Sequence, residues 1–452
     1  MSSSTRHAGT RQRNTAAAAA SSSSSTTQDT TGSSPSSSST PSAGVASKPS
    51  SSGQGFAGRC LRRCGWFLVY AFIIVITPMV MNHAALSKEQ KALMPTPGSL
   101  VRINKHQRLF LRCLGHGSPV VVLEAPMGQT HSVFEKLQMS LAKHTRVCSY
   151  DRAGLGFSER PFVNRSDPAM QSRKQGMPHT VEHMAEDLYK LLVVESGLPP
   201  PYVLVGVELG ALISRFFAQI FEGAVGAVVL VDPLVEGVEN FEQGAIRRHW
   251  RDTRLFPWQA QQLAAATGLY RLALLTGTAA NVEFDGLTER QVDRKKHLMC
   301  QPAHWQSAVE ELFLVNETSA QIQLLWRIKS FPSNISVSMV TGDPDSSLSD
   351  PINKAWQQSH SHLLDKLHPT CKHTRVPAVR GQDLVDKRSA KLHEVILKAV
   401  DSVKEAVAAA APATDAQGVP AASPASESAQ NVGDIPLNLT PDMPPTVPPF
   451  KL

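Results

Sequence analysis

The sequence predicts an α/β fold with a mostly parallel central sheet, helices on both faces, an all-helical cap insertion and an N-terminal transmembrane helix. Short, continuous apolar runs alternate with stretches of helical periodicity, which is typical of parallel strands buried on both faces. From Asp232 to Pro332 no run has strand character. We therefore expect a helical cap over the C-terminal edge of the sheet, where open α/β sheets bind their ligands.

The predicted elements follow in a regular order. Residues 100–103 and 108–113 alternate around a polar turn and predict a β-hairpin. Further strands are expected at 120–124, 146–150, 202–205, 225–231, 337–341 and 374–379. Helices are expected outside the cap at 134–143, 180–195, 211–221 and 387–407. Cap helices are expected at 242–251, 258–275, 287–299 and 305–328.

The two ends of the chain are predicted to be disordered. Residues 1–57 are mostly Ser, Ala and Thr, and residues 411–452 are rich in Pro, Ala and Ser, so neither can bury enough apolar surface to offset chain entropy. The main domain is expected at 98–405, with the cap at 235–332. The formal net charge is +7, but no basic run alternates with aromatic residues, which excludes a nucleic-acid partner. The cluster Arg247, Arg248, Arg251 and Arg254 is interpreted as solvated helix faces.

An uncharged stretch at 65–81, extended by residues to 86, predicts a single-pass membrane anchor. Arg59, Arg62 and Arg63 precede it. The positive-inside rule then places the N-terminus in the cytosol and the main domain in the lumen of the secretory pathway or outside the cell. The acid-poor, Arg- and Ser-containing N-terminus also fits a mitochondrial presequence before an inner-membrane anchor, and this alternative stays open.

Candidate glycosylation sites and cysteines bear on the same question. The N-x-S/T triplets begin at Asn164, Asn316, Asn334 and Asn438, and they agree with a lumenal domain. Cys113 and Cys148 fall in expected buried strands and are interpreted as small apolar core residues. Cys300 and Cys371 are the better candidates for a disulfide, although the sequence does not fix a pairing.

The turn between residues 202–205 and 211–221 has the strand–turn–helix setting of a nucleophile elbow, G-x-S-x-G. Gly206 and Gly210 suit the sharp turn, but the apex residue is Glu208 in place of serine. We expect the carboxylate to accept backbone hydrogen bonds at the start of the helix, where the dipole favours negative charge.

Four runs together resemble the α/β-hydrolase superfamily, over residues 98–405. They are VVVLEAPMG at 120–128, YDRAGLGFS at 150–158, VGVELGALISR at 205–215 and TGDPD at 341–345. The resemblance implies an α/β-hydrolase fold and a catalytic Ser, Asp and His in that chain order. It also implies an oxyanion hole made by the backbone N–H groups of Met127 and Leu209, which would face the carboxylate of Glu208.

The remaining triad positions are only partly filled. The resemblance assigns the acid position to Asp345, with Asp343 as an alternative, and the base position to Gln382. A glutamine cannot take a proton from a nucleophile. Neither His373 nor His393 is placed to replace the base.

We therefore expect a catalytically inactive hydrolase fold that binds an apolar small molecule or lipid-like ligand under the cap, or a protein partner, without a cofactor or metal. Two alternatives keep it an enzyme of the hydrolase class. In one, Glu208 is a carboxylate nucleophile acting on ester, lipid or epoxide-like substrates. In the other, the catalytic residues lie elsewhere, for example at Ser158 or Ser214.

Overall fold

The structure, a computed structural model, describes residues 54–161, 178–279, 284, 286–377, 384–385 and 389–410. The chain forms two compact units, Met1–Cys64 and Gly65–Leu452. The described part of the first unit is the start of a long helix, α1 (Gln54–Leu93). The sheet, the cap and the candidate site all belong to the second unit.

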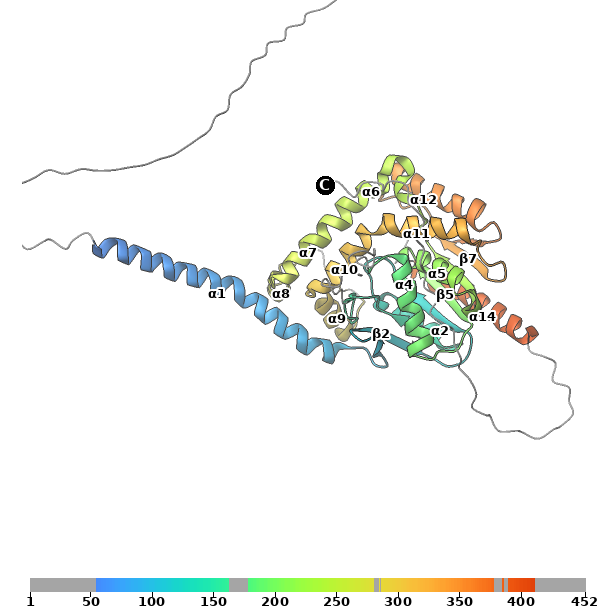
Figure 1. The fold of residues 1–452 in the computed structure, drawn as a ribbon, viewed down its shortest axis with the longest axis horizontal. Helices are drawn as coiled ribbons and strands as arrows, with labels where there is room; N and C mark the ends of the chain where they lie inside the picture. Colours follow the sequence, from blue (N-terminus) through green and yellow to red (C-terminus); the bar gives the residue numbers. More distant parts are fainter. Residues whose placement is uncertain are drawn as a thin grey trace, which may run out of the picture. The chain divides into compact units, whose positions relative to one another are not determined.

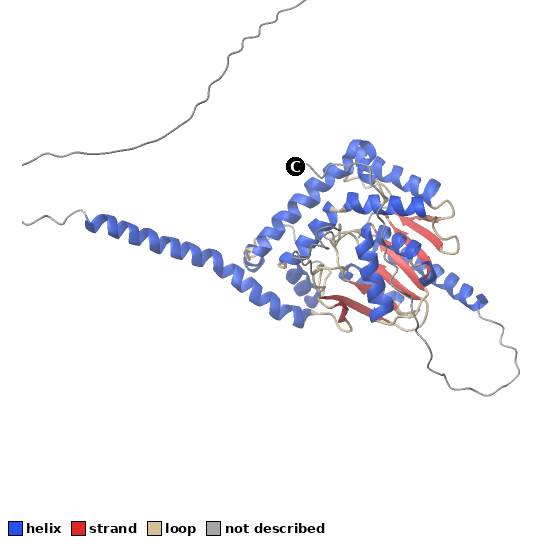
Figure 2. Cartoon of the chain, in the orientation of Figure 1, coloured by secondary structure: helices blue, strands red, loops and turns tan. Residues whose placement is uncertain are grey.

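An eight-stranded sheet forms the centre of this unit (Figures 1 and 2), in the order β1-β2-β4-β3-β5-β6-β7-β8. The strands are β1 (Ser99–Asn104), β2 (Gln107–Leu114), β3 (Val120–Glu124), β4 (Val147–Tyr150), β5 (Tyr202–Val207), β6 (Val225–Val231), β7 (Ser336–Thr341) and β8 (Lys372–Arg375). β2 runs antiparallel to β1 and β4, and the other pairs are parallel. The predicted fold class and hairpin are confirmed.

The last strand begins two residues earlier than predicted, at Lys372 in place of Thr374. β8 is an edge strand whose residues pair with β7 from Ser338 onward. Its side chains are polar and none is buried. The apolar signal that located the central strands is therefore missing at this edge.

Two apolar layers sandwich the sheet. The first layer contains side chains from α4 (Val181–Tyr189), α5 (Leu209–Ile220), α11 (Val315–Ile328) and α12 (Asp350–His362). The second contains side chains from α2 (Glu135–Leu141) and α14 (Ser389–Ala410). The sequence did not predict α12. Its buried side chains are few, Ile352, Ala355, Trp356 and Ser359, in an otherwise polar stretch.

The cap follows β6 and, in its described residues, contains helices and no strand (Figure 2). Its segments are η5 (Val238–Gly244), α6 (Ala245–Trp250), the π-helical η6 (Arg251–Leu255), α7 (Phe256–Ala266), α8 (Leu269–Leu275), α9 (Glu289–Met299) and α10 (Pro302–Phe313), followed by α11. The helix predicted at 258–275 is divided at Gly268, which has a φ of +76°, a conformation that interrupts a helix and suits glycine. The helix predicted at 305–328 is likewise divided, between α10 and α11.

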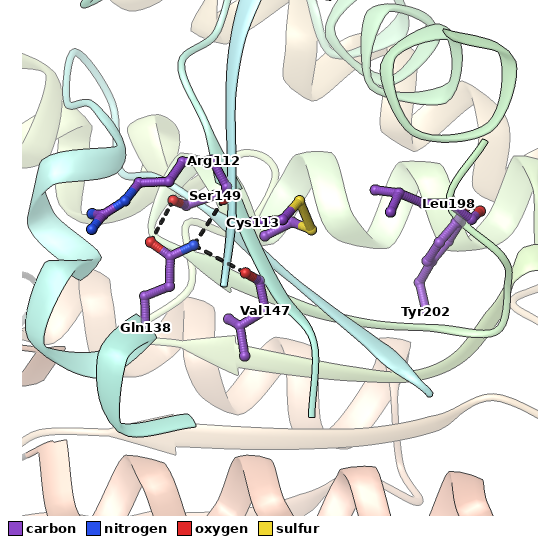
Figure 3. Close-up of a disulfide and its surroundings, with 8 residues drawn as sticks. Arg112, Cys113, Gln138, Val147, Ser149, Leu198 and Tyr202 are labelled. Atoms are coloured by element: carbon purple, nitrogen blue, oxygen red, sulfur yellow. Dashed lines mark hydrogen bonds between the residues drawn. A yellow bond between two sulfur atoms is a disulfide. The ribbon is translucent and has the colours of Figure 1, made fainter. Parts of the chain in front are cut away.

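A disulfide joins Cys113 of β2 to Cys148 of β4, with an S–S distance of 2.08 Å (Figure 3). The interpretation of these cysteines as free core residues is wrong. They are register partners on neighbouring antiparallel strands, and this adjacency cannot be read from the sequence. Cys300 and Cys371, which the sequence favoured as disulfide candidates, are both free thiols.

Within the described residues, one helical segment, Arg62–Leu93, is long and apolar enough to cross a membrane, with a mean hydropathy of 2.2. Pro78 lies inside this helix without ending it, as is tolerated in spanning helices. Length and composition thus support the predicted anchor.

Candidate functional site

The candidate site is built on the turn between β5 and α5. Glu208 occupies the apex with a φ of 50° and a ψ of −110°, a backbone conformation that costs energy for any residue with a side chain. A Cβ on Gly206 would lie 2.3 Å from the carbonyl oxygen of Gly210, and a Cβ on Gly210 would lie 2.4 Å from that of Glu124. Only glycine fits at both positions, so the turn keeps the geometry of an elbow.

The Glu208 carboxylate is held from two sides. Oε2 accepts a hydrogen bond from the backbone N–H of Met127 at 3.3 Å, as predicted. Oε1 lies 2.6 Å from Nη2 of Arg254, and the two side chains are 11% and 28% exposed. The N–H of Leu209 makes no hydrogen bond to this carboxylate, so the expected second backbone donor is replaced by a cap arginine.

Arg254 comes from η6 and is packed between aromatic residues of the cap. Its guanidinium carbon lies 5.6 Å from the ring centroid of Trp250 and 6.0 Å from that of Trp258. Its Nη1 also contacts Sδ of Met127 at 3.7 Å. The interpretation of Arg254 as a solvated surface residue is wrong. The tryptophans four residues before and after it were the sequence signal that could have identified its position.

A second arginine, Arg152, fixes the loop that carries Met127. Its guanidinium is buried and donates to the carbonyl oxygens of Ala125 at 2.7 Å and Pro126 at 2.8 Å. It also donates to Glu124 at 3.0 Å and to Glu311 of α10 at 2.7 and 3.0 Å. One side chain therefore connects the sheet, the oxyanion loop and the cap.

Burial sets the electrostatics of this network. It raises the pKa of Glu124 to about 7, against the opposing effects of Arg152 and of Tyr150, whose hydroxyl donates to Oε2 of Glu124 at 2.5 Å. Burial also disfavours the charged form of Arg152, but Glu311 and Glu124 outweigh it and hold the pKa of Arg152 above its ordinary value. Oε2 of Glu311 accepts the N–H of Gly128 at 2.7 Å, so the backbone beyond Met127 is fixed as well.

The acid position lies at the other end of the expected triad. The Asp345 carboxylate accepts hydrogen bonds from the backbone N–H of Ser347 at 2.8 Å and from its hydroxyl at 2.7 Å. The alternative acid, Asp343, pairs with Arg375 at 2.7 Å. Both aspartates thus have partners within their own edge of the sheet. The base position, Gln382, lies outside the described residues.

Ser158 and Ser214 are not nucleophiles at an elbow. The Ser158 hydroxyl donates to the carbonyl oxygen of Asp151 at 2.5 Å and accepts the N–H of Phe110 at 2.9 Å. Ser214 is buried inside α5, with 1% of its surface exposed.

Two buried histidines, His304 and His368, accept hydrogen bonds away from the elbow. Nδ1 of His304 accepts the N–H of Gly156 at 3.3 Å, and burial lowers the pKa of His304 to about 4. Nε2 of His368 accepts from Arg215 at 3.1 Å, and burial, followed by the charge of Arg215, lowers the pKa of His368 to about 3. These neutral rings serve as hydrogen-bond acceptors in the core.

Comparison with known proteins agrees with this geometry. Residues 118–313 match the family model described as the alpha/beta hydrolase fold. The chain has the α/β-hydrolase fold. The match covers the elbow, the loop after β3 that carries Met127, and the cap through α10.

Other proteins with similarity to this α/β-hydrolase fold are distant or only partly matched. A probable transporter, efuK of Hormonema carpetanum, is 33% identical over 30% of this chain and 18% of its own length. An AB hydrolase superfamily protein of Gibberella zeae is 31% identical over 25% of this chain and 32% of its own length. The chain therefore spans less than half the length of either relative. The solved epoxide hydrolase VrEH1 of Vigna radiata is 15% identical, covers 67% of this chain and 96% of its own, and has a TM-score of 0.48.

The glycosylation candidates have different surroundings. Asn334 is exposed in the turn before β7, beside a surface cavity of 450 Å³ that also contacts Glu222 and Lys329. This cavity lies at the N-terminal ends of β6 and β7, away from the elbow. Asn316 is half-buried near the start of α11. Asn164 and Asn438 lie outside the described residues.

Proposed function

We propose that this α/β-hydrolase-fold protein has lost serine-hydrolase activity and binds a lipid-like ligand, whose anionic group competes with Glu208 for Arg254. The observation that carries the proposal is the ion pair between Oε1 of Glu208 and Arg254 at 2.6 Å. It fills the nucleophile position with a carboxylate that already has a cationic partner.

The loss of serine chemistry follows from what the elbow contains. Removal of the nucleophilic serine or the histidine base from a serine hydrolase costs on the order of 10⁶ in kcat. The apex residue is Glu208, and the family resemblance puts Gln382 at the base position. In addition, Oε2 of Glu208 accepts the Met127 N–H, a donor that would otherwise be available to an oxyanion.

The surroundings of Arg254 favour an amphiphilic anion. The Arg254 side chain is 28% exposed, and its guanidinium lies beside Trp250, Trp258 and Met127. A guanidinium recognises a carboxylate or phosphate through charge-assisted hydrogen bonds, and the aromatic and thioether groups beside it suit an attached apolar chain.

Binding of a fatty acid such as dodecanoate to the full chain in lipid nanodiscs tests the proposal. Arg254→Gln should weaken binding about 10- to 150-fold, since a hydrogen bond to a charged group is worth about 1.5–3 kcal/mol. Glu208→Ala should strengthen binding by removing the internal competitor. The matched control is Arg251→Gln, because Arg251 lies in the same segment but pairs with Asp252. Equal affinities for all four proteins would contradict the proposal.

A carboxylate nucleophile is the second candidate, favoured by the position of Glu208 at the apex with a positive φ. Carboxylates at catalytic sites form covalent ester intermediates. Mass spectrometry of the Glu208 peptide after exposure to an epoxide would reveal such an ester. A peptide that stays unmodified counts against this candidate.

We further propose that α1 anchors the main domain in the lumen of the secretory pathway or outside the cell. Arginines on the N-terminal side of the apolar stretch support this orientation, and the Cys113–Cys148 disulfide supports an oxidising compartment. A gel shift on glycosidase treatment that is reduced by Asn334→Gln is the expected result. Import into mitochondria without any glycan would favour the alternative.

A further inference from the structure

We propose that the turn between α7 and α8, together with the leucines beside it, docks on the lipid bilayer next to α1. We call this surface the cap corner and define it by Leu263, Leu269, Leu272 and Leu275. It is a second contact with the membrane, supplied by the cap itself. It does not depend on the ligand proposed for Arg254.

The cap corner is unusually apolar for an exposed surface. Its leucines are 67%, 55%, 48% and 75% exposed, in chain order. They lie at the end of α7 and along α8, two helices that pack on each other. Single exposed leucines are common, but a group of them on neighbouring turns marks a site of protein or membrane contact.

A buried polar contact fixes the cap against α1. Asn82 of α1 is only 3% exposed. Its Nδ2 donates to the carbonyl oxygens of Ala265 at 2.9 Å and Cys300 at 3.0 Å, and its Oδ1 accepts from Nε of Arg271 at 2.7 Å. A buried amide with its hydrogen bonds satisfied by three partners holds a specific geometry, so the cap cannot slide along α1 without losing them.

A second contact lies farther along the same helix. The Glu89 carboxylate accepts hydrogen bonds from both terminal nitrogens of Arg271, at 2.6 and 2.8 Å. Nδ1 of His297 lies 2.9 Å from Oε2 of Glu89. Cap residues from α8 and α9 therefore contact α1 at two levels. Because α1 continues as one helix, these contacts also define the level of the cap relative to the apolar stretch.

The contact at Gly268 gives the depth of the cap corner. A Cβ on Gly268 would lie 2.2 Å from the carbonyl oxygen of Pro78, so the turn touches α1 inside the uncharged stretch 65–81. At about 1.5 Å per residue that stretch is about 26 Å long, close to the roughly 30 Å of a hydrocarbon layer. Pro78 then lies near the boundary of the hydrocarbon layer, and the turn reaches the same level.

Polar and apolar groups are ordered as a membrane surface requires. The leucines Leu263 and Leu269 lie within five residues of the turn that touches Pro78, whereas the Glu89–Arg271 pair meets α1 beyond the uncharged stretch. Apolar side chains at the acyl boundary and charged groups among the headgroups are the arrangement of interfacial helices. Continuity with the anchor therefore favours the bilayer as the partner of this surface.

Depth-dependent fluorescence quenching tests the proposal on the full chain in phosphatidylcholine vesicles. In a background with Cys60→Ser and Cys64→Ser, an NBD probe is attached at Leu269→Cys or Leu275→Cys, and quenching by doxyl-labelled lipids is measured. The matched control is Ile328→Cys, since Ile328 is 57% exposed but ends α11 next to Lys329, which lines the cavity at the N-terminal ends of β6 and β7. The background protein without a new cysteine gives the signal from buried Cys300 and half-buried Cys371.

We expect blue-shifted, strongly quenched emission at positions 269 and 275 and aqueous, unquenched emission at 328. Adding Asn82→Leu should reduce quenching at 269 without changing the signal at 328, because the cap loses its fixed level on α1. Aqueous emission at both leucine positions would overturn the proposal. Blue-shifted emission that lipid quenchers do not reduce, and that appears only at a high ratio of protein to lipid, would also overturn it, because the surface would then contact a second chain.

Discussion

The two sides of the candidate site, at β5 and at β7–β8, differ in their contacts. At the β5 edge, the turn at Glu208, the close approaches at Gly206 and Gly210 and the Met127 N–H are in place. At the β7–β8 edge, the carboxylates that could orient a base have local partners, Ser347 for Asp345 and Arg375 for Asp343. Close backbone approaches hold the β5 side of the site, whereas half-exposed side-chain contacts hold the β7–β8 side.

This difference is consistent with the proposed loss of serine-hydrolase activity in a fold that stays intact. The elbow is compatible with Glu208 because Arg254 and Met127 satisfy the carboxylate. The structural demands lie instead in the buried network around Arg152 and in the glycines. Substitutions should therefore lower stability strongly on the β5 side of the site and weakly on the β7–β8 side.

The largest expected effect is at Arg152. Arg152→Gln leaves Glu124 and Glu311 without their shared cation, and removing one partner of a buried pair costs about 3–5 kcal/mol. Urea unfolding of the full chain in detergent measures the loss. Arg160→Gln is the control, because Arg160 and Glu310 form a pair that is 29% and 31% exposed. Equal losses of unfolding free energy in the two variants would show that the Arg152 network is not the main support of the elbow.

The next effect is a pH dependence at His304, which supports the 150–158 loop through Gly156. Burial lowers the pKa of His304 from the ordinary histidine value of 6.5 to about 4, so the folded state favours the neutral ring. That stability is fully present above about pH 6.5 and is lost as the pH falls through about 4, to a total of about 3 kcal/mol. His304→Gln should unfold with a shallower pH dependence than the natural protein over this range; parallel curves would rule out the effect.

Gly210 should be more sensitive than a glycine outside the site. Gly210→Ala drives a Cβ toward the carbonyl oxygen of Glu124, and overpacking of this kind costs about 1–3 kcal/mol. The control is Gly223→Ala, since nothing lies within 4 Å of its added Cβ. Thermal unfolding of both variants gives the difference, and a loss at Gly223 as large as at Gly210 would refute it.

The smallest effect is expected at Asp345. Asp345→Ala removes the hydrogen bonds to Ser347 in a half-exposed turn, which should cost about 1 kcal/mol. Dodecanoate affinity should stay unchanged, because the carboxylate has no part in ligand binding. A stability loss comparable to that of Arg152→Gln, or a loss of affinity, would show that this edge still has a role in the site.

The sequence predicted the fold well because its signals were local. Local apolar runs predicted β3, β5 and β6, and the two elbow glycines predicted the turn. The polar strand β8 was predicted two residues too late, and the polar helix α12 was not predicted. The contacts of the site are long-range, and no local pattern identified them. Glu311 reaches Gly128 across 183 residues, Arg254 reaches Glu208 from the cap, and Cys113 meets Cys148 only because β2 pairs with β4.

Labelling of the Glu208 carboxylate by water is the most direct test of the proposal that the elbow is inactive. The protein is incubated with ester and epoxide substrates in ¹⁸O-labelled water, and the Glu208 peptide is analysed by mass spectrometry. A carboxylate nucleophile would acquire ¹⁸O each time water cleaves its ester intermediate, even when that intermediate is too short-lived to trap. We predict no incorporation at Glu208 and no product above that of Glu208→Ala. Label in this peptide, with turnover that Glu208→Ala abolishes, would contradict the proposed loss of catalysis.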